Sequence, residues 1–368
     1  MKKRMVSQDI AKGIAILLVV QTHTLQLTRP VGTVLGVLFG YAMPFFLFIS
    51  GYNYRPNART PWENIRRRTW QILKPFLIYS LSLFVIMGIY FLVRHEATVP
   101  ELFKSFAAFL MSKWGARLIG WNLPQVLFQR ILGPYWFLQF LVTANIFFYL
   151  FVDRALSSTA RLISTLVLLS GISVFLIEMK VVLPWGLQNA PAIAGVMILA
   201  AWMHQKDCLF SEPSAKYWKW INAFVALLTI GLTQLFHSGA GYVGAGALGE
   251  VCGGAEVYIM YVMAVCGSYL IITISGLIEK CRFLTRILTW LGTHTLQILM
   301  LHLAVMHVLK DIFGLPQTNA ADSLFVDHVE PMNVVVYFAT IFVCVGIILL
   351  IEKIRASLSE RKKSVPAQ

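Results

Sequence analysis

Charged residues and cysteines are both scarce in this sequence. Only 13% of its 368 residues are charged, 58% are hydrophobic, and the mean hydropathy is +0.70. A soluble domain carries more charge than this, so the composition excludes one. The five cysteines are scattered, with neither a disulfide framework nor a metal-site spacing. Apolar runs of about 20 residues recur along the chain and predict an all-α integral membrane protein.

The apolar runs predict about ten membrane-spanning helices in a single domain over residues 1–368. We place them at residues 10–27, 33–53, 71–93, 134–152, 161–178, 189–205, 219–236, 254–277, 287–309 and 332–352. No internal repeat, soluble catalytic domain or low-complexity tract is visible in the sequence. The first run is polar near its end and has no small-residue cleavage site, so we expect a retained span and not a removed signal peptide.

The net charge of +14 has a simple explanation in this topology. With the N-terminus inside, most of the 31 basic residues fall on the cytosolic side, as the positive-inside rule requires. Both termini are then cytosolic, including a basic tail over residues 353–368. The charge is therefore an orientation signal, so we expect membrane lipids and no nucleic acid as partners.

Three connections are longer than neighbouring spans need. Residues 94–133 include an apolar pattern of helical spacing at 101–121, which predicts an amphipathic helix in the membrane interface. Residues 237–254 are glycine-rich and lack the strand and helix that flank a phosphate-binding loop, so flexible or re-entrant backbone is expected. Residues 310–331 form an acidic loop on the predicted outer side.

A lysine and a histidine stand in the first predicted span. His23 stands eleven positions after Lys12, and eleven steps of about 100° return an α-helix to nearly the same face, about 16 Å further along. His23 is either a histidine satisfied by packing or a functional group. Its polar neighbours favour function, because they indicate a helix that faces protein or water. A neutral imidazole there can accept a proton, so we predict that His23 is catalytic.

A cluster of cations follows the second predicted span and comprises Arg66, Arg67, Arg68 and Lys74. Such clusters commonly anchor a protein at anionic headgroups. Their side chains also suit phosphate oxygens, and Lys12 lies at the same predicted membrane face. Ser50 and Gly51 end the second span, where they permit either close helix packing or close approach of a ligand to the backbone. All these residues are candidates for binding a phosphate-bearing donor.

Aromatic and histidine residues mark two further spans. Tyr135 and Trp136 open the fourth span, as an aromatic belt or as a platform for a sugar ring. His302 lies in the ninth span at about the depth of His23, so both histidines are predicted to face one cavity. We take these three residues as candidate substrate contacts. Because no third ligand stands at a suitable spacing, we expect no metal site.

Carboxylates are missing from the middle of the predicted spans. Glu178, Glu250 and Glu256 all fall at outer ends. An ion-coupled transporter usually keeps a carboxylate nearer the midplane, so the pattern counts against one. A transporter or flippase for a glycan precursor or an amphiphile nevertheless suits the composition equally well and stays the alternative.

Four motifs occur in order along the chain. They are Lys12 with His23 after ten intervening residues, then "FFLFISGY", "YWFL" and "LGTHTLQILMLH". Together they resemble membrane-bound acyltransferase family 3, and within it the fucose O-acetylase branch, over residues 9–302. One departure is in "RRRTWQILKP": the family often has two arginines three apart before this proline, and Gln71 stands where the second is expected.

The resemblance implies a membrane-bound O-acetyltransferase. Such an enzyme transfers an acyl group, usually acetyl, from cytosolic acetyl-CoA to a hydroxyl of a cell-envelope or surface glycan, including lipid-linked ones. It also implies residence in the cell inner (plasma) membrane. His23 would act as a general base or as a covalent acyl relay.

Overall fold

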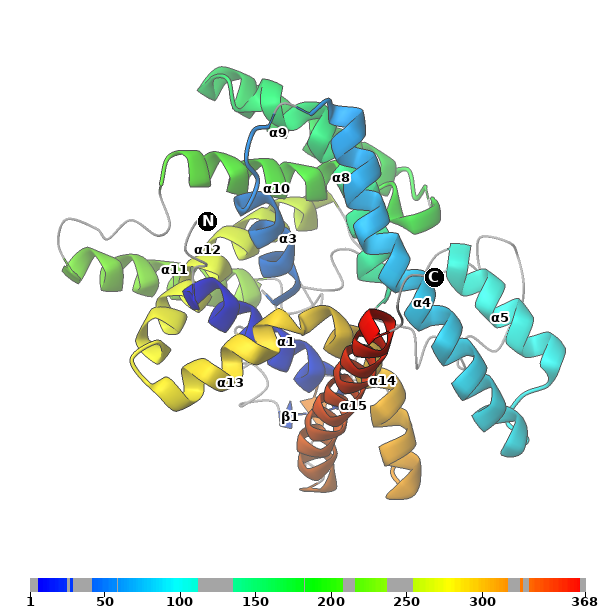
Figure 1. The fold of residues 1–368 in the computed structure, drawn as a ribbon. Coiled ribbons are helices and arrows are strands. Elements are labelled where there is room, and N and C mark those ends of the chain that lie inside the picture. The colour runs from blue at the N-terminus through cyan, green and yellow to red at the C-terminus, as the bar shows by residue number, and fades with distance from the viewer. Residues whose placement is uncertain are drawn as a thin grey trace.

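The computed structural model describes residues 6–24, 27–28, 42–57, 59–111, 135–181, 183–207, 216–236, 254–316, 325–326 and 331–364. Almost all of this part of the chain is helical (Figure 1). The helices are α1 (Val6–Thr24), α3 (Ala42–Tyr52), α4 (Pro61–Val93), α5 (Val99–Met111), α8 (Trp136–Ala155), α9 (Thr159–Glu178), α10 (Ala190–Gln205), α11 (Lys216–Phe236), α12 (Gly254–Ile278), α13 (Arg282–Thr293), α14 (Thr295–Ile312) and α15 (Pro331–Ser364). A short 3-10 turn, Pro184–Gly186, precedes α10, and the strands β1 (Leu27–Thr28) and β2 (Phe325–Val326) pair in parallel.

Seven of the described helices are long and apolar enough to cross a membrane. Their apolar stretches are Pro61–Val93, Trp136–Ala155, Thr159–Glu178, Pro184–Gln205, Val257–Ile278, Thr295–Ile312 and Pro331–Leu358. Helix α3 and the apolar part of α11 are shorter. The all-helical membrane class is therefore confirmed, whereas the count of about ten spans and the cytosolic placement of both termini stay predictions.

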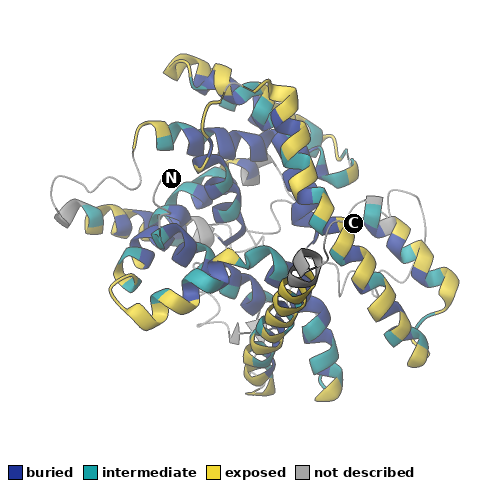
Figure 2. Ribbon diagram, in the orientation of Figure 1, coloured by how far each residue is buried: buried dark blue, intermediate teal, exposed yellow. Residues whose placement is uncertain are grey.

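The helices divide into a buried group and a peripheral group (Figure 2). In the stretch that includes α10, 78% of the apolar window is buried, against 22% in α15 and 28% in α9. Helix α10 packs on α3, α8 and α9, and α1 packs on α12, α13 and α14. The exposed apolar side chains of α9 and α15 suit contact with lipid, while the buried group forms the core that surrounds the site.

The predicted ninth span, 287–309, is wrong as one continuous helix. Helix α13 ends at Thr293 and α14 begins at Thr295, because His294 has φ −110° and ψ 16° and interrupts the helical backbone. Helix α13 is amphipathic and packs along α1, while α14 alone has the length and composition of a span. The break places Thr293 and Thr295 at a junction between two helices.

Helix α4 begins at Pro61, so Arg66, Arg67 and Arg68, which precede the predicted third span, are helical. Thr60 caps α4: its hydroxyl accepts from the Glu63 N–H at 3.3 Å, and the Glu63 carboxylate accepts from the Thr60 N–H at 2.8 Å. This capping box starts the helix well before its apolar part. Helix α4 then continues through Pro75, which leaves the carbonyl group of Gln71 without its helical donor.

The predicted long connections are described in part. The amphipathic helix expected within 101–121 is α5, with Leu102, Phe106 and Phe109 buried, and it packs on α4. Its position in a membrane interface stays a prediction. Residues 112–133 and 237–253 lie outside the described residues, as does most of 317–330.

Candidate active site

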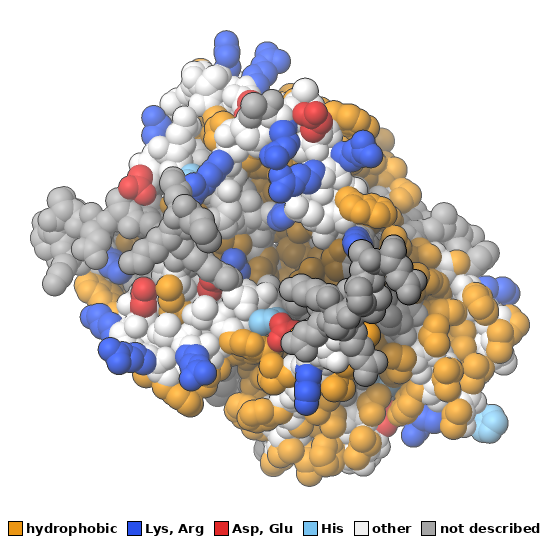
Figure 3. Space-filling view, viewed as in Figure 1, with side chains coloured by type: hydrophobic (Ala, Val, Ile, Leu, Met, Phe, Trp, Pro, Cys, Tyr) orange, Lys and Arg blue, Asp and Glu red, His pale blue; other side chains and the backbone are white. Residues whose placement is uncertain are grey.

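A cavity of about 460 Å³ lies between α1, α3, α8 and α14. Residues from one face of each helix line it: Lys12 and Ile16 of α1; Met43, Phe46, Ile49 and Ser50 of α3, with Asn53 just beyond; Phe137, Leu138 and Leu141 of α8; and Thr295, Leu296 and Leu299 of α14. Arg68, Gly292 and Thr293 complete the lining. Figure 3 shows a hollow with hydrophobic side chains inside it and lysine and arginine side chains around it.

The cavity changes from polar to apolar along its length. Asn53, Ser50 and Arg68 lie at one end, where α3 finishes, and Met43 lies at the other, where α3 begins. Helix α14 runs the opposite way, from the polar Thr295 to the apolar Leu299. A molecule that fits this cavity therefore has one polar end and one apolar end.

A second cavity of about 520 Å³ adjoins the first at its polar end, and we call it the basic cleft. The two cavities share Ser50, Asn53 and Arg68. The cleft is further lined by Tyr54, Arg55, Asn57, Arg59, Asn64, Arg67, Gln71, Asn145, Phe148 and Tyr149. Four arginines and several amides in one cleft form a site for an anion rich in oxygen acceptors, such as a phosphate ester.

Side-chain contacts hold the shape of the basic cleft. The guanidinium of Arg68 donates to the Ser50 hydroxyl and to the Gln71 side-chain oxygen, each at 3.4 Å. Tyr54 donates its hydroxyl proton to the Asp153 carboxylate at the end of α8. Burial, together with that carboxylate, raises the pKa of Tyr54 well above its usual value, so the phenol stays a donor at neutral pH.

Lys12 reaches the cavity from a helix held in close contact with α13. Its ammonium group lies 3.1 Å from the Asp9 carboxylate, which is buried. A Cβ atom on Gly13 would overlap the backbone of Leu288, and one on Gly292 would overlap the Asp9 carbonyl oxygen. Glycine at both positions thus lets the two backbones touch, which brings Lys12 beside the α13–α14 junction.

His23 and His302 come together near the apolar end of the cavity without lining it, since His302 lies three residues beyond Leu299 on α14. Their ring centroids are 5.5 Å apart, and His302 is fully buried. The Nδ1 atom of His302 lies 3.0 Å from the carbonyl oxygens of Ile298 and Leu299. Because carbonyl oxygens only accept, Nδ1 carries the proton and Nε2 keeps a lone pair. Among the described residues Nε2 has no hydrogen-bond partner, so it can accept one from a substrate or from the neighbouring imidazole.

The break between α13 and α14 is held by its own histidine. His294 stacks on Trp290 with ring centroids 4.1 Å apart, and its Nδ1 lies 2.8 Å from the Trp290 carbonyl oxygen. Its Nε2 lies 2.9 Å from the Glu352 carboxylate of α15. These contacts fix the junction whose threonines line the cavity, and sequence reasoning did not identify this role for His294.

The predicted site residues separate into two groups in the structure. Lys12, Ser50, Arg67 and Arg68 line the cavities. His23 and His302 meet each other but line neither cavity, and the other predicted residues are also absent from the described linings. Arg66 and Lys74 are exposed on α4, and Gly51 packs against the Met197 backbone of α10.

Tyr135 and Trp136 belong to the group that does not line either cavity. Tyr135 is fully buried and donates its hydroxyl proton to the Met300 carbonyl at 2.8 Å. Trp136 is 8% exposed and packs edge-on to Phe140.

Arg55 and Arg59 line the basic cleft but were not predicted, because they precede α4 in a segment without a periodic pattern. The capping-box signature at residues 60–63 was the available signal that a helix begins between Arg59 and Arg66.

Within the ranges that the structure describes, no group of three or more His, Cys, Asp or Glu side chains could hold a metal ion.

A helical membrane protein with a basic cleft that opens into a cavity ending near two histidines suits group transfer from a large anionic donor. Comparison with protein families shows which class this is. The model of acyltransferase family 3, an acyltransferase domain, matches residues 6–353 and thus nearly the whole chain. The chain belongs to this family and is a multi-pass membrane acyltransferase. Comparisons with curated proteins and with solved structures return no match.

Proposed function

We propose that this acyltransferase moves an acetyl group from cytosolic acetyl-CoA to a hydroxyl of a cell-envelope or surface glycan, in the inner (plasma) membrane. One observation carries the proposal: the basic cleft and the cavity share residues and together lead from four arginines toward His23 and His302. The glycan acceptor, as in the fucose O-acetylase branch, rests on the sequence motifs.

The donor would lie with its phosphates in the basic cleft. Arg55, Arg59, Arg67 and Arg68 supply charge-assisted hydrogen bonds there. The flexible arm would pass Ser50 and Asn53 into the cavity, with Lys12 at its side and the thioester at the apolar end. This arrangement matches the change from polar to apolar along the cavity.

The histidine pair would supply the proton chemistry. In the direct route, His23 removes the proton from the acceptor hydroxyl, and the oxygen attacks the thioester carbonyl. The carbon–sulfur bond breaks, and the proton passes to the leaving thiolate, which gives CoA and the acetyl ester. The Nε2 lone pair of His302 would accept a hydrogen bond that orients His23 or the acceptor.

The second route is a covalent relay. His23 would attack the thioester first, release CoA and carry the acetyl group as an acetyl-imidazole until the acceptor hydroxyl takes it. The two routes differ in kinetics. A burst of CoA release before acceptor is added, with trapped acetylated His23, supports the relay; a strict need for both substrates before any release supports direct transfer.

CoA release from acetyl-CoA tests the proposal. Wild type and His23→Ala are purified, placed in lipid vesicles and assayed with and without crude cell-envelope glycan. We expect release that rises with glycan and is lost in the variant. If folded wild-type protein releases no CoA with any glycan and acetyl-CoA does not raise its melting temperature, the proposal is wrong. A transport function would then account better for the cavities.

A further inference from the structure

Met43 of α3 lines the apolar end of the cavity. Along the lined face of this helix, Asn53 stands at the basic cleft and Met43 stands last. They are ten positions apart, which corresponds to about 15 Å of helix. Only Ala42 precedes Met43 in α3, so no further residue of this helix continues the lining.

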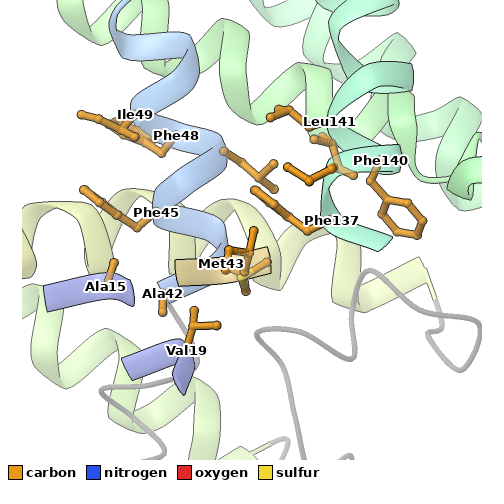
Figure 4. Close-up of a cluster of buried hydrophobic side chains, with 14 of the residues drawn as sticks. Ala15, Val19, Ala42, Met43, Phe45, Phe48, Ile49, Phe137, Phe140 and Leu141 are labelled. Carbon is orange, nitrogen blue, oxygen red and sulfur yellow. The ribbon is translucent and has the colours of Figure 1, made fainter. Parts of the chain in front are cut away.

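The part of α1 that carries His23 lies close to Met43. Val19 of α1 lies in the same buried cluster as Met43 and Phe137 (Figure 4). Val19 and His23 are four residues apart on α1 and therefore share a face. On α14, His302 lies three residues beyond Leu299, the last residue of that helix to line the cavity. Met43 thus lies at the apolar end of the cavity, beside the side of α1 that carries His23.

The side chain at position 43 is suited to limit length. Methionine is unbranched and fills irregular gaps, and Met43 is 9% exposed, so it takes up space at the cavity end. Ile16, Phe137 and Leu299 line the cavity near this end, on helices α1, α8 and α14. When the phosphates of the donor lie at the arginines and its arm lies in the cavity, the acyl group is the part nearest Met43.

We infer that Met43 closes the apolar end of the cavity and makes the enzyme select donors with a short acyl group, such as acetyl, over donors with a longer one, such as octanoyl. The inference rests on the proposed function, since it assigns the acyl part of the same donor to this end. One methylene too many in an apolar pocket weakens binding by roughly tenfold or more. Met43 therefore determines donor length, while the arginines determine that the donor is a CoA ester.

Equilibrium binding of acetyl-CoA, butanoyl-CoA and octanoyl-CoA to the purified full chain tests this. Three proteins are compared: wild type, Met43→Ala and Ile49→Ala. Ile49 lines the same cavity two turns nearer the basic cleft, so its truncation enlarges the cavity without lengthening it. We expect Met43→Ala to shift the ratio of octanoyl-CoA to acetyl-CoA affinity by about tenfold or more toward octanoyl-CoA. Ile49→Ala should weaken binding of both donors alike and leave this affinity ratio within about twofold of the wild-type value.

Two results overturn the inference. One is a ratio in Met43→Ala equal to that of wild type, and the other is an equal shift in Ile49→Ala. If Met43→Ala does not fold, Met43→Phe tests the same point in the other direction, and affinity for butanoyl-CoA should fall more than affinity for acetyl-CoA. Wild-type protein that binds none of the three donors contradicts the proposed function itself. Binding of all three with no effect of position 43 contradicts only this inference.

Discussion

The basic cleft and the histidine pair lie toward opposite ends of one cavity and are built differently. The cleft is lined by arginines and amides from α4, α8 and the segment before α4, of which Arg55, Arg59 and Arg67 are exposed. The pair consists of a partly buried His23 in the last turn of α1 and a fully buried His302 within α14. Exposed side chains can adapt to a ligand, whereas buried rings on packed helices keep a fixed geometry.

The difference teaches which measurement each end should affect. A residue that only holds the donor contributes equally to the bound substrate and to the transition state, and its loss changes affinity. A residue that moves a proton acts in the transition state, and its loss changes kcat. Variants at the two ends should therefore separate binding from chemistry.

The largest expected effect is at the histidine end. His23→Gln should lower kcat for acetyl transfer by roughly 10²–10⁴-fold, because it removes the proton-accepting group. The affinity for acetyl-CoA should stay within about twofold of wild type, measured by titration with the same protein sample. Full activity in the variant would show that His23 only packs between helices.

Arg68 at the other end should show the opposite pattern. Arg68→Gln is expected to weaken acetyl-CoA binding by about tenfold, because Arg68 lines both cavities and supplies hydrogen bonds to a charged group. The kcat at saturating donor should change little. Arg66→Gln is the matched comparison, since Arg66 is on the same helix but lines neither cavity. Equal losses from the two variants would mean that general positive charge, and not the cleft, attracts the donor.

Disrupting the contact between α1 and α13 should lower the stability of the protein more than it changes donor affinity or kcat. Gly292→Ala places a methyl group on the Asp9 carbonyl oxygen, and such overpacking costs about 1–3 kcal/mol. A lower midpoint of thermal unfolding in detergent would show it. Gly171→Ala in α9 is the control, because nothing lies within 4 Å of the added atom. Similar midpoints for both variants would contradict the close contact.

The smallest expected effect comes from the caps. Thr60→Ala removes the hydroxyl that caps α4 and should cost about 1 kcal/mol, with a small loss of acetyl-CoA affinity because the cap lies beside the arginines. Ser158→Ala removes the corresponding cap of α9 at a similar cost. Since Ser158 does not line the cleft, only the first variant should weaken binding of the donor. Equal donor affinity in the two variants would show that the cap of α4 does not contribute to donor binding.

Much of the fold follows from the sequence by elementary patterns. The apolar runs mark most of the spans, and the matched depth predicted for His23 and His302 agrees with rings 5.5 Å apart. The start of α4 was also readable, since Thr60 and Glu63 form a capping box in the structure. Local patterns carry these features because each depends on residues within a few turns of one another.

The remaining features depend on contacts between distant segments. The helix break at His294 has no proline to announce it, and its histidine contacts Glu352, 58 residues away. Arg55 and Arg59 reach the cleft only because the chain turns between α3 and α4. Gly51 packs on α10 instead of lining a cavity, which no local pattern distinguishes from ligand contact.

The two glycines between α1 and α13 have one more consequence. Gly13 lies on Leu288, and Asp9 lies on Gly292, so two points four residues apart on each helix pair in antiparallel order. A single contact would permit sliding or rotation, but two reciprocal contacts exclude both. The crossing therefore fixes the position of α1 along its own axis. The place of His23, ten residues beyond Gly13, is set by a contact about 15 Å away that takes no part in the reaction.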